Sequence, residues 1–496
     1  MPSKPTTRWQ VSGYRFLVRR MEHALVRRDV RMLHDPMRAQ SRAYAVGLVL
    51  GILVLAGCGV LALLKPQDKI GDSKILIGKE SGGVYVVIDN VVHPALNIAS
   101  ARLAAGEAAT AAIVKESELS SKPRGQLIGI PGAPTSIRYD KDGNGRPWTV
   151  CDQLKGDGST DLSTSVLAGA PELGTKAAAL EGARALLVKG RDATYLVYDG
   201  KRARVNLADR PVTVALGIAD ATPRPISEGL LNAIPEVLPI VSPVIANPGG
   251  VPSYSASSHR IGDVVQVFNE PNRNYVVLHG GLQEISPLTA QIIRNNYSTT
   301  MAGTTIQSTE AANANRSTEL KVGAYPQEAP RLVTAKDAPV SCLSWRPLEG
   351  ATDNADGTAR AALSVLTGVA LPMPDAAKLV SLAQADGSGP HADAVYIPPS
   401  TGAYVQSTGI EPDSRRKDSL FYIADTGVRF GIKDAEAAKA LGLESVPAEP
   451  APWPIIGLLA GGPSLGREDA MVAHDGVAPD PSPAKTPVAT VQPSAN

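Results

Sequence analysis

The hydrophobic pattern of the chain is dominated by one apolar run near the N-terminus. It extends from Ala43 to Leu64, 22 residues without a charged side chain. At about 1.5 Å of rise per residue, a helix of this length reaches roughly 33 Å, which is enough to cross a bilayer. The run therefore predicts a single transmembrane helix over residues 43–64.

Two other interpretations of this run fit less well. A cleaved signal peptide has a short basic leader, whereas about forty residues precede the run. The sequence Leu55-Ala-Gly-Cys58 resembles a lipoprotein signal, but the apolar run continues for six residues beyond Cys58. We therefore expect Cys58 to be a small thiol within the membrane helix.

The charges on the two sides of the predicted membrane helix differ. The residues before it carry ten basic and three acidic side chains, a net charge of +7. Basic flanks of membrane helices stay in the cytoplasm. After the helix, Lys65 is soon followed by the acid-containing sequence QDKIGDSK. We therefore expect a cytoplasmic N-terminus, one pass through the membrane and an exported C-terminal portion.

Apolar residues also recur at helical spacing before the membrane, between Val11 and Arg31. Residues such as Tyr14, Leu17 and Met21 follow one another at intervals of three to four, which predicts an amphipathic helix. Its basic side suits anionic headgroups or a cytoplasmic partner protein, and both remain open. The candidate contact residues are Arg19, Arg20, Arg27 and Arg28.

Beyond the membrane helix, one short strand pattern occurs four times. Each copy opens with an aromatic residue, continues with alternating apolar residues and ends in a turn. The copies begin at Tyr85, Tyr195, Tyr275 and Phe421. A second short strand and a helix-like stretch follow, as at 208–218 and 433–443. The pattern predicts four small α+β repeats, spaced too irregularly for a solenoid of equal units.

Two cysteines lie outside the membrane helix, in the sequences WTVCDQ and VSCLSW. In an oxidising compartment, Cys151 and Cys342 are expected to form a disulfide that stabilises the fold by up to about 5 kcal/mol. The alternative is two separate buried thiols. A metal site is disfavoured because two cysteines supply too few ligands.

The two cysteines fall in the first and last gaps between repeats, which predicts a central domain built from two separate pieces. The expected fold class is α+β, with one N-terminal transmembrane helix and four small repeat subdomains around a disulfide-linked central domain. The expected ranges are 1–42 for the cytoplasmic basic helix, 43–64 for the membrane helix, 65–137 for repeat 1, 138–190 for the first central piece, 191–254 for repeat 2, 255–334 for repeat 3, 335–370 for the second central piece, 371–476 for repeat 4 and 477–496 for a disordered tail.

Charge and motifs argue against several functions. The net charge is +1, from 49 basic and 48 acidic residues, so no overall field attracts nucleic acid. The sequence contains no G-x-x-x-x-G-K-[ST] string, the motif whose backbone and lysine hold nucleotide phosphates. Asp140, Asp142, Asn144 and Gly145 resemble the start of a calcium loop, but Cys151 stands where a glutamate is required.

A G-x-S-x-G string occurs around Ser464, but Asp469 and His474 follow within ten residues instead of on later strands. We interpret Ser464 as the N-cap of a helix that begins near Arg467. The seven histidines are scattered along the chain. We therefore predict no catalytic, cofactor or metal site.

Several segments together resemble the EccB family, a core membrane component of type VII (ESX) secretion systems. The resemblance covers nearly the whole chain. The matching segments are QVSGYRFLVRR, KPQ at the membrane exit, VVHPALNIASARL, PRGQLIGIPGAP, WTVCD, SCLSW, SLFYIADTGVRFGI and APWPIIGLLAGGPSLGREDA. The resemblance implies a structural subunit of an inner-membrane complex that also contains EccC, EccD, EccE and other EccB copies.

Two alternative functions differ in class from a scaffold. Members of the family are sometimes called ATPases, so an ATP-binding hydrolase of the same secretion system is one alternative. A cell-wall binding module that contacts peptidoglycan is the other, because exported repeats with exposed turns often carry ligand sites.

Overall fold

The computed structural model describes residues 7–31, 36–64, 70–139, 145–156, 160–254, 259–297, 304–348, 359–445 and 447–477. Two helices precede the first β-sheet, α1 (Arg8–Arg27) and α2 (Pro36–Leu64). Of the helices in these ranges, only α2 is long and apolar enough to cross a membrane, over Gln40–Leu61. The predicted membrane helix is confirmed, and it contains Cys58, which is exposed in the chain alone.

The first small sheet follows the membrane helix in sequence. Its elements are β1 (Ile75–Gly78), β2 (Val84–Ile88), β3 (Val91–Ala95), α3 (Ile98–Ala105), β4 (Ala112–Val114), α4 (Glu116–Leu119) and β5 (Leu127–Ile128). The first three strands form an antiparallel meander. Strand β4 then runs parallel to β1, and β5 runs parallel to β3.

The second small sheet has the same plan. Its elements are β9 (Arg184–Lys189), β10 (Thr194–Tyr198), β11 (Lys201–Val205), α5 (Arg210–Ala215), β12 (Arg224–Pro225), α6 (Glu228–Ala233) and β13 (Glu236–Ile240). After the meander, β12 is parallel to β9 and β13 is parallel to β11. A later strand, β18 (Arg331–Leu332), also pairs with β9.

The third small sheet contains β14 (Val264–Val267), β15 (Glu270–Val277), β16 (Leu282–Ile285), α7 (Pro287–Asn296), β17 (Thr304–Ile306) and α8 (Ser308–Asn313). Strand β17 is parallel to β14. An isolated parallel bridge between Leu282 and Arg316 stands where the other repeats have their last strand.

The fourth small sheet contains β23 (Ala403–Thr408), β24 (Leu420–Ile423), β25 (Val428–Ile432), α9 (Ala435–Leu441), β26 (Glu449–Pro452), α10 (Trp453–Ile456) and β27 (Ala460–Gly461). Strand β26 is parallel to β23, and β27 is parallel to β25. The chain ends its described part with α11 (Arg467–Ala470) and β28 (Ala473–His474).

The four sheets confirm the predicted repeats and explain the aromatic residue in each copy. Tyr85, Tyr195, Tyr275 and Phe421 all lie on the middle strand of a meander. In the first two copies the turn residues have positive φ, as at Asp89 and Asn90. Such turns match the twist of a tight hairpin and favour Asn, Asp and Gly.

The central sheet is the largest and is assembled from both halves of the chain. Its elements are β6 (Trp148–Leu154), β7 (Leu162–Ala168), β8 (Ala177–Ala179), β19 (Val340–Pro347), β20 (Ala361–Gly368), β21 (Val380–Ser381) and β22 (Ala394–Tyr396). The strand order is β21-β22-β7-β6-β19-β20-β8. Antiparallel pairing of β6 with β19 joins the two pieces.

Strand pairing places some elements outside the ranges expected from the sequence. Strand β9 lies within the expected first central piece but belongs to the second repeat. Strands β21 and β22 lie within the expected fourth repeat but extend the central sheet. Strand β28 crosses over to pair with β5 of the first repeat. A short apolar run shows that a strand forms but not which sheet it joins, so the other boundaries stay predictions.

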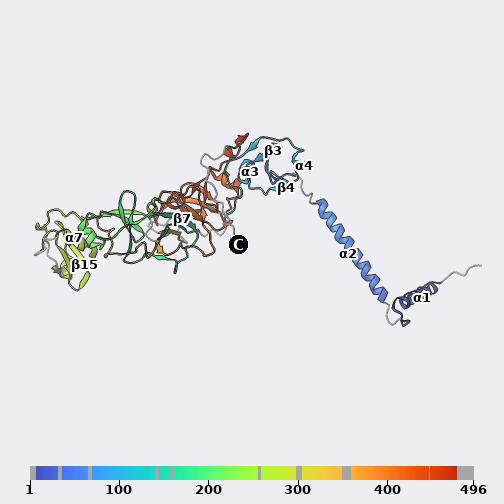
Figure 1. Ribbon diagram of the computed structural model, residues 1–496, viewed down its shortest axis with the longest axis horizontal. Helices are drawn as coiled ribbons and strands as arrows, with labels where there is room; N and C mark the ends of the chain where they lie inside the picture. The colour runs from blue at the N-terminus through green and yellow to red at the C-terminus, as the bar shows by residue number, and fades with distance from the viewer. Residues whose placement is uncertain are drawn as a thin grey trace, which may run out of the picture.

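The repeats pack in two pairs through their helices. Helix α3 of repeat 1 contacts α9 and α11, and helix α5 of repeat 2 contacts α7 of repeat 3. One face of the central sheet is covered by α6 and α10, the second helices of repeats 2 and 4. Figure 1 accordingly shows repeat 1 next to α2, with α7 and β15 of repeat 3 at the opposite end of an elongated molecule.

Candidate functional site

The disulfide lies at the middle of the central sheet. Cys151 on β6 and Cys342 on β19 face each other in the strand register and are bonded. Both are buried, in an apolar cluster with Leu167, Val340 and Leu366. The bridge therefore ties together segments 191 residues apart, and the predicted disulfide-linked central domain is confirmed.

A buried polar cluster lies beside the disulfide and is centred on Asp152, the residue that follows Cys151. The Asp152 carboxylate is 1% exposed and accepts hydrogen bonds from the Ser227 backbone N–H and hydroxyl, each at 2.7 Å. The hydroxyl of Thr164 on β7 donates to the same carboxylate at 2.9 Å. Ser227 is also the N-cap of α6, because its Oγ accepts from the Leu230 N–H at 3.0 Å.

Arg224 faces this cluster and is 5% exposed. Its guanidinium donates to the carbonyl oxygens of Ala338 and Pro339 at 2.8 and 3.2 Å. Burial lowers the pKa of Arg224, and the charge of Asp152 opposes that shift. The cluster thus connects the central sheet, the start of α6 in repeat 2 and the segment that leads into β19. The sequence analysis did not predict this cluster. A serine before a helix, such as Ser227, is a recognisable N-cap, but its partner Asp152 lies 75 residues away in the sequence.

Burial raises the pKa of Asp152, and hydrogen bonds from Ser227 and Thr164 and the charge of Arg224 oppose the rise only in part. The folded chain therefore holds this proton to a higher pH than the unfolded chain, whose reference pKa is 3.8. Because the folded state binds more protons, the free energy of unfolding contributed by this group falls as pH rises above about 4.

The direction of this pH dependence can be tested with Asp152→Asn, because asparagine does not titrate. The free energy of unfolding of the parent minus that of the variant should decrease as pH rises from about 4, and then level off. Urea unfolding at a series of pH values measures the difference. Asp220→Asn removes the same charge from an exposed site and controls for net charge. A difference for Asp152→Asn that is flat or rises with pH would contradict the assignment.

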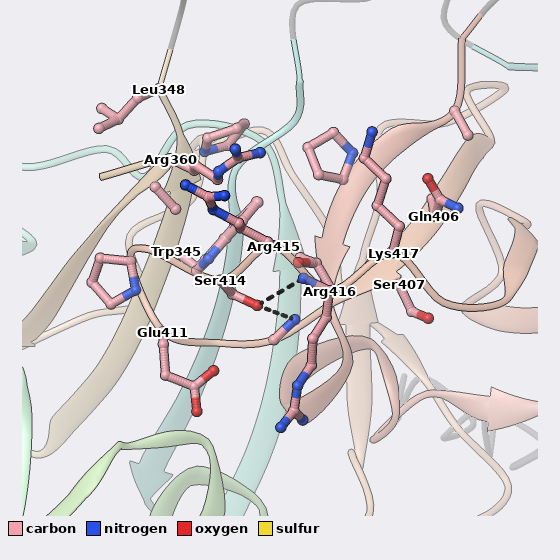
Figure 2. A pocket seen from close by; sticks show the side chains of 17 residues that line it. Trp345, Leu348, Arg360, Gln406, Ser407, Glu411, Ser414, Arg415, Arg416 and Lys417 are labelled. Atoms are coloured by element: carbon pink, nitrogen blue, oxygen red, sulfur yellow. Dashed lines mark hydrogen bonds between the residues drawn. The ribbon is translucent and has the colours of Figure 1, made fainter. Parts of the chain in front are cut away.

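A basic pocket lies at the junction between the central sheet and repeat 4 (Figure 2). It has a volume of about 250 Å³ and is lined by the ends of β19 and β20 and by the turn between β23 and β24. The basic lining residues are Arg360, Arg415, Arg416 and Lys417. Glu411 is the one acidic residue among those that line it.

Backbone contacts hold the turn of this pocket in place. The Arg360 and Ala361 N–H groups both donate to the Pro412 carbonyl, at 2.6 and 3.1 Å. The Ser414 Oγ accepts from the N–H groups of Gly409 and Arg416 at 3.2 and 3.4 Å, drawn as dashed lines in Figure 2. A Cβ at Gly409 would lie 2.5 Å from the Ser414 Oγ, so a larger residue here would have to displace that hydroxyl.

The basic helix α1 lies before the membrane helix in the sequence and buries no residue. The predicted contact residues Arg19, Arg20 and Arg27 lie on α1, and Arg28 is its C-cap. All four are exposed, and no residue of α1 is buried. Their assignment to lipid or partner contact stays a prediction, because the structure contains the chain alone.

Two motif interpretations can be compared with the structure. Helix α11 begins at Arg467 as expected, but its N-cap is Gly466, so the prediction that Ser464 caps it was wrong. The reason is that the chain between them is extended to pair at Leu465 with Ile432. His474 instead contacts the Gly129 carbonyl at 2.8 Å. The calcium-like residues 140–144 lie outside the described residues.

The fold and these clusters define a membrane-anchored α+β repeat protein with a disulfide-braced centre. A family model described as "Type VII secretion system ESX-1, transport TM domain B" matches residues 3–479. The chain therefore belongs to the EccB family of type VII secretion proteins, as the sequence segments predicted.

Individual relatives agree with this placement. The ESX-3 secretion system ATPase EccB3 of Mycobacterium tuberculosis is 38% identical over 503 residues, covering 97% of this chain and 91% of the relative. The ESX-1 secretion system ATPase EccB1 of the same species is 36% identical over 489 residues, covering 97% and 98%.

Solved structures are similar over most of the chain. A chain of the intact ESX-5 inner membrane complex has a TM-score of 0.75 and 31% identity, covering 98% of this chain and 99% of that chain. The EccB3 dimer from the ESX-3 core complex has a TM-score of 0.70 and 37% identity, covering 81% and 100%. A chain of the periplasmic assembly of the ESX-5 complex has a TM-score of 0.70 and 32% identity, covering 84% and 100%.

Proposed function

We propose that this chain is a structural subunit of an inner-membrane type VII secretion complex. The observation that carries the proposal is the structural likeness, over 98% of the chain, to a component of the intact ESX-5 inner membrane complex. Its partners would be EccC, EccD and EccE type subunits and further copies of the chain, with the bilayer around α2. The similarity to a solved EccB3 dimer supports contact between copies.

The proposed orientation has the N-terminus in the cytoplasm and the repeats in the periplasm. The net charge of +7 before α2 supports a cytoplasmic N-terminus. The buried disulfide supports an oxidising compartment for the central sheet. The likeness of 84% of the chain to a chain of a periplasmic assembly agrees with both.

A structural role is favoured over catalysis, although relatives carry ATPase in their names. The polar groups of the buried cluster are used to join elements: Asp152 binds Ser227 and Thr164, and Arg224 binds backbone carbonyls. The sequence contains no P-loop motif. Among the described residues, no group of three His, Cys, Asp or Glu side chains could hold a metal ion.

We therefore expect the purified full-length chain in detergent to release no phosphate from ATP above the background of a mock purification. Phosphate release is measured at a fixed protein concentration after two different purification schemes. A rate that stays proportional to the protein in both schemes, and that one point substitution in the chain abolishes, would contradict the structural role and favour the hydrolase alternative.

A further inference from the structure

The basic pocket between the central sheet and repeat 4 has the composition of an anion site. Four of its lining side chains are basic and one is acidic. In Figure 2 the side chains of Arg360, Arg415 and Lys417 extend toward the same side of the pocket, while Arg416 extends the opposite way. The Arg360 and Arg415 guanidinium groups present paired N–H donors, a geometry that matches the oxygens of phosphate and carboxylate.

The neutral groups of the pocket are also rich in donors. Trp345 lines it and is 3% exposed, yet its indole Nε1 is buried and donates to no partner. An indole N–H can only donate. The Ser414 hydroxyl accepts two backbone N–H bonds and still carries a proton that it can donate. The Trp345 Nε1 has almost no accessible surface, so the donors that a ligand in the cavity can reach are the Ser414 hydroxyl and the basic side chains.

The pocket is also a preformed structure. The turn that carries Arg415 and Lys417 is fixed by the bonds from Arg360 and Ala361 to the Pro412 carbonyl. Because Arg360 directly precedes β20 of the central sheet and the turn belongs to repeat 4, a ligand held by both would connect the two units. The volume of about 250 Å³ is at the small end of ligand sites and suits one charged group with a short substituent.

We propose that this pocket binds the phosphate group of a phosphorylated small molecule or polymer, through Arg360, Arg415 and Lys417. Phosphate is favoured over a single carboxylate because one phosphate offers several acceptor oxygens and up to two negative charges to three cations. Arg360, Arg415 and Lys417 already make interactions within the chain, so the ligand would share or displace these and binding is expected to be weak.

The test uses the full-length chain in detergent and isothermal titration calorimetry at constant ionic strength. The probes are inorganic phosphate, glycerol 3-phosphate and a short polyglutamate peptide. Binding of both phosphate compounds indicates a site for the phosphate group itself, whereas binding of glycerol 3-phosphate alone indicates a phosphate ester. The peptide tests the alternative of an acidic protein segment.

Arg415→Gln and Lys417→Gln are both at exposed positions, and each should weaken phosphate binding about tenfold through loss of a charge-assisted contact. Lys378→Gln removes a charge from an exposed position outside the pocket and should leave the affinity unchanged. Thermal unfolding of each variant checks that the fold is retained.

Three results would overturn the proposal. The first is that neither inorganic phosphate nor glycerol 3-phosphate binds detectably. The second is that Lys378→Gln weakens phosphate binding as much as Arg415→Gln or Lys417→Gln does. The third is that the peptide binds in a way that depends on Arg415 while neither phosphate compound binds. None of these results bears on membership of the secretion complex, because that rests on the family match and the membrane anchor and not on this pocket.

Discussion

Replacing Cys151 and Cys342 together by alanine is expected to lower the free energy of unfolding of the part that follows α2 by up to about 5 kcal/mol. The bond closes a loop of 191 residues, and long loops gain much conformational freedom in the unfolded chain when their cross-link is removed. Both residues are buried, and alanine leaves no unpaired polar group in their place.

Reductant and a second cysteine provide the controls for this experiment. Urea unfolding of the parent should shift to lower urea when a strong reductant is added, whereas the double alanine variant should not respond. Cys58→Ala removes the cysteine that lies on α2 and should leave the parent's reductant response intact. Equal midpoints for the oxidised parent and the double variant would show that the bridge contributes nothing to stability.

Replacing Arg19, Arg20, Arg27 and Arg28 by glutamate should strongly weaken recovery of the other membrane subunits with this chain. An acidic face of a partner subunit would attract these four positive charges, and reversal to glutamate replaces that attraction by repulsion between like charges. The four side chains are exposed and α1 buries no residue. The four repeats should therefore unfold at the parent's temperature.

A fourfold lysine variant at the same positions separates charge from arginine geometry. Lysine retains the charge but not the planar fork, so normal recovery with lysine and loss with glutamate would indicate general charge attraction to an acidic face of a partner. Loss with both would indicate specific arginine contacts to a partner. Normal recovery of the complex with the glutamate variant would show that α1 is only a surface anchor.

The parts of this structure that were predictable from sequence have local signals. The membrane helix follows from the uninterrupted apolar run at 43–64, and α1 follows from helical spacing. Tyr85 and its counterparts marked the four meanders, because a middle strand with two neighbours needs alternating apolar residues and tight turns. The disulfide was predictable because the only two cysteines outside the membrane helix fall in a part of the chain that is expected to be exported.

The features that were missed depend on contacts between distant segments. Asp152 is hydrogen-bonded to Ser227, and β28 pairs with β5 more than three hundred residues away along the sequence. The pairing of α3 with α9 and of α5 with α7 depends on which repeat faces which. No periodicity in one sequence specifies these choices, because each repeat offers a similar apolar helix face. The basic pocket likewise combines Arg360 with a turn that follows it by roughly fifty residues in the chain.

The central claim, that this chain is a structural subunit of an inner-membrane secretion complex, is tested most directly by purifying the tagged full-length chain from membranes of its own host. Native electrophoresis and mass spectrometry of the purified material identify what accompanies it. The account predicts a large assembly that contains further copies of this chain and the other type VII membrane subunits in fixed proportion. Recovery of the chain alone under mild detergent, with those subunits assembled normally without it, would contradict the account.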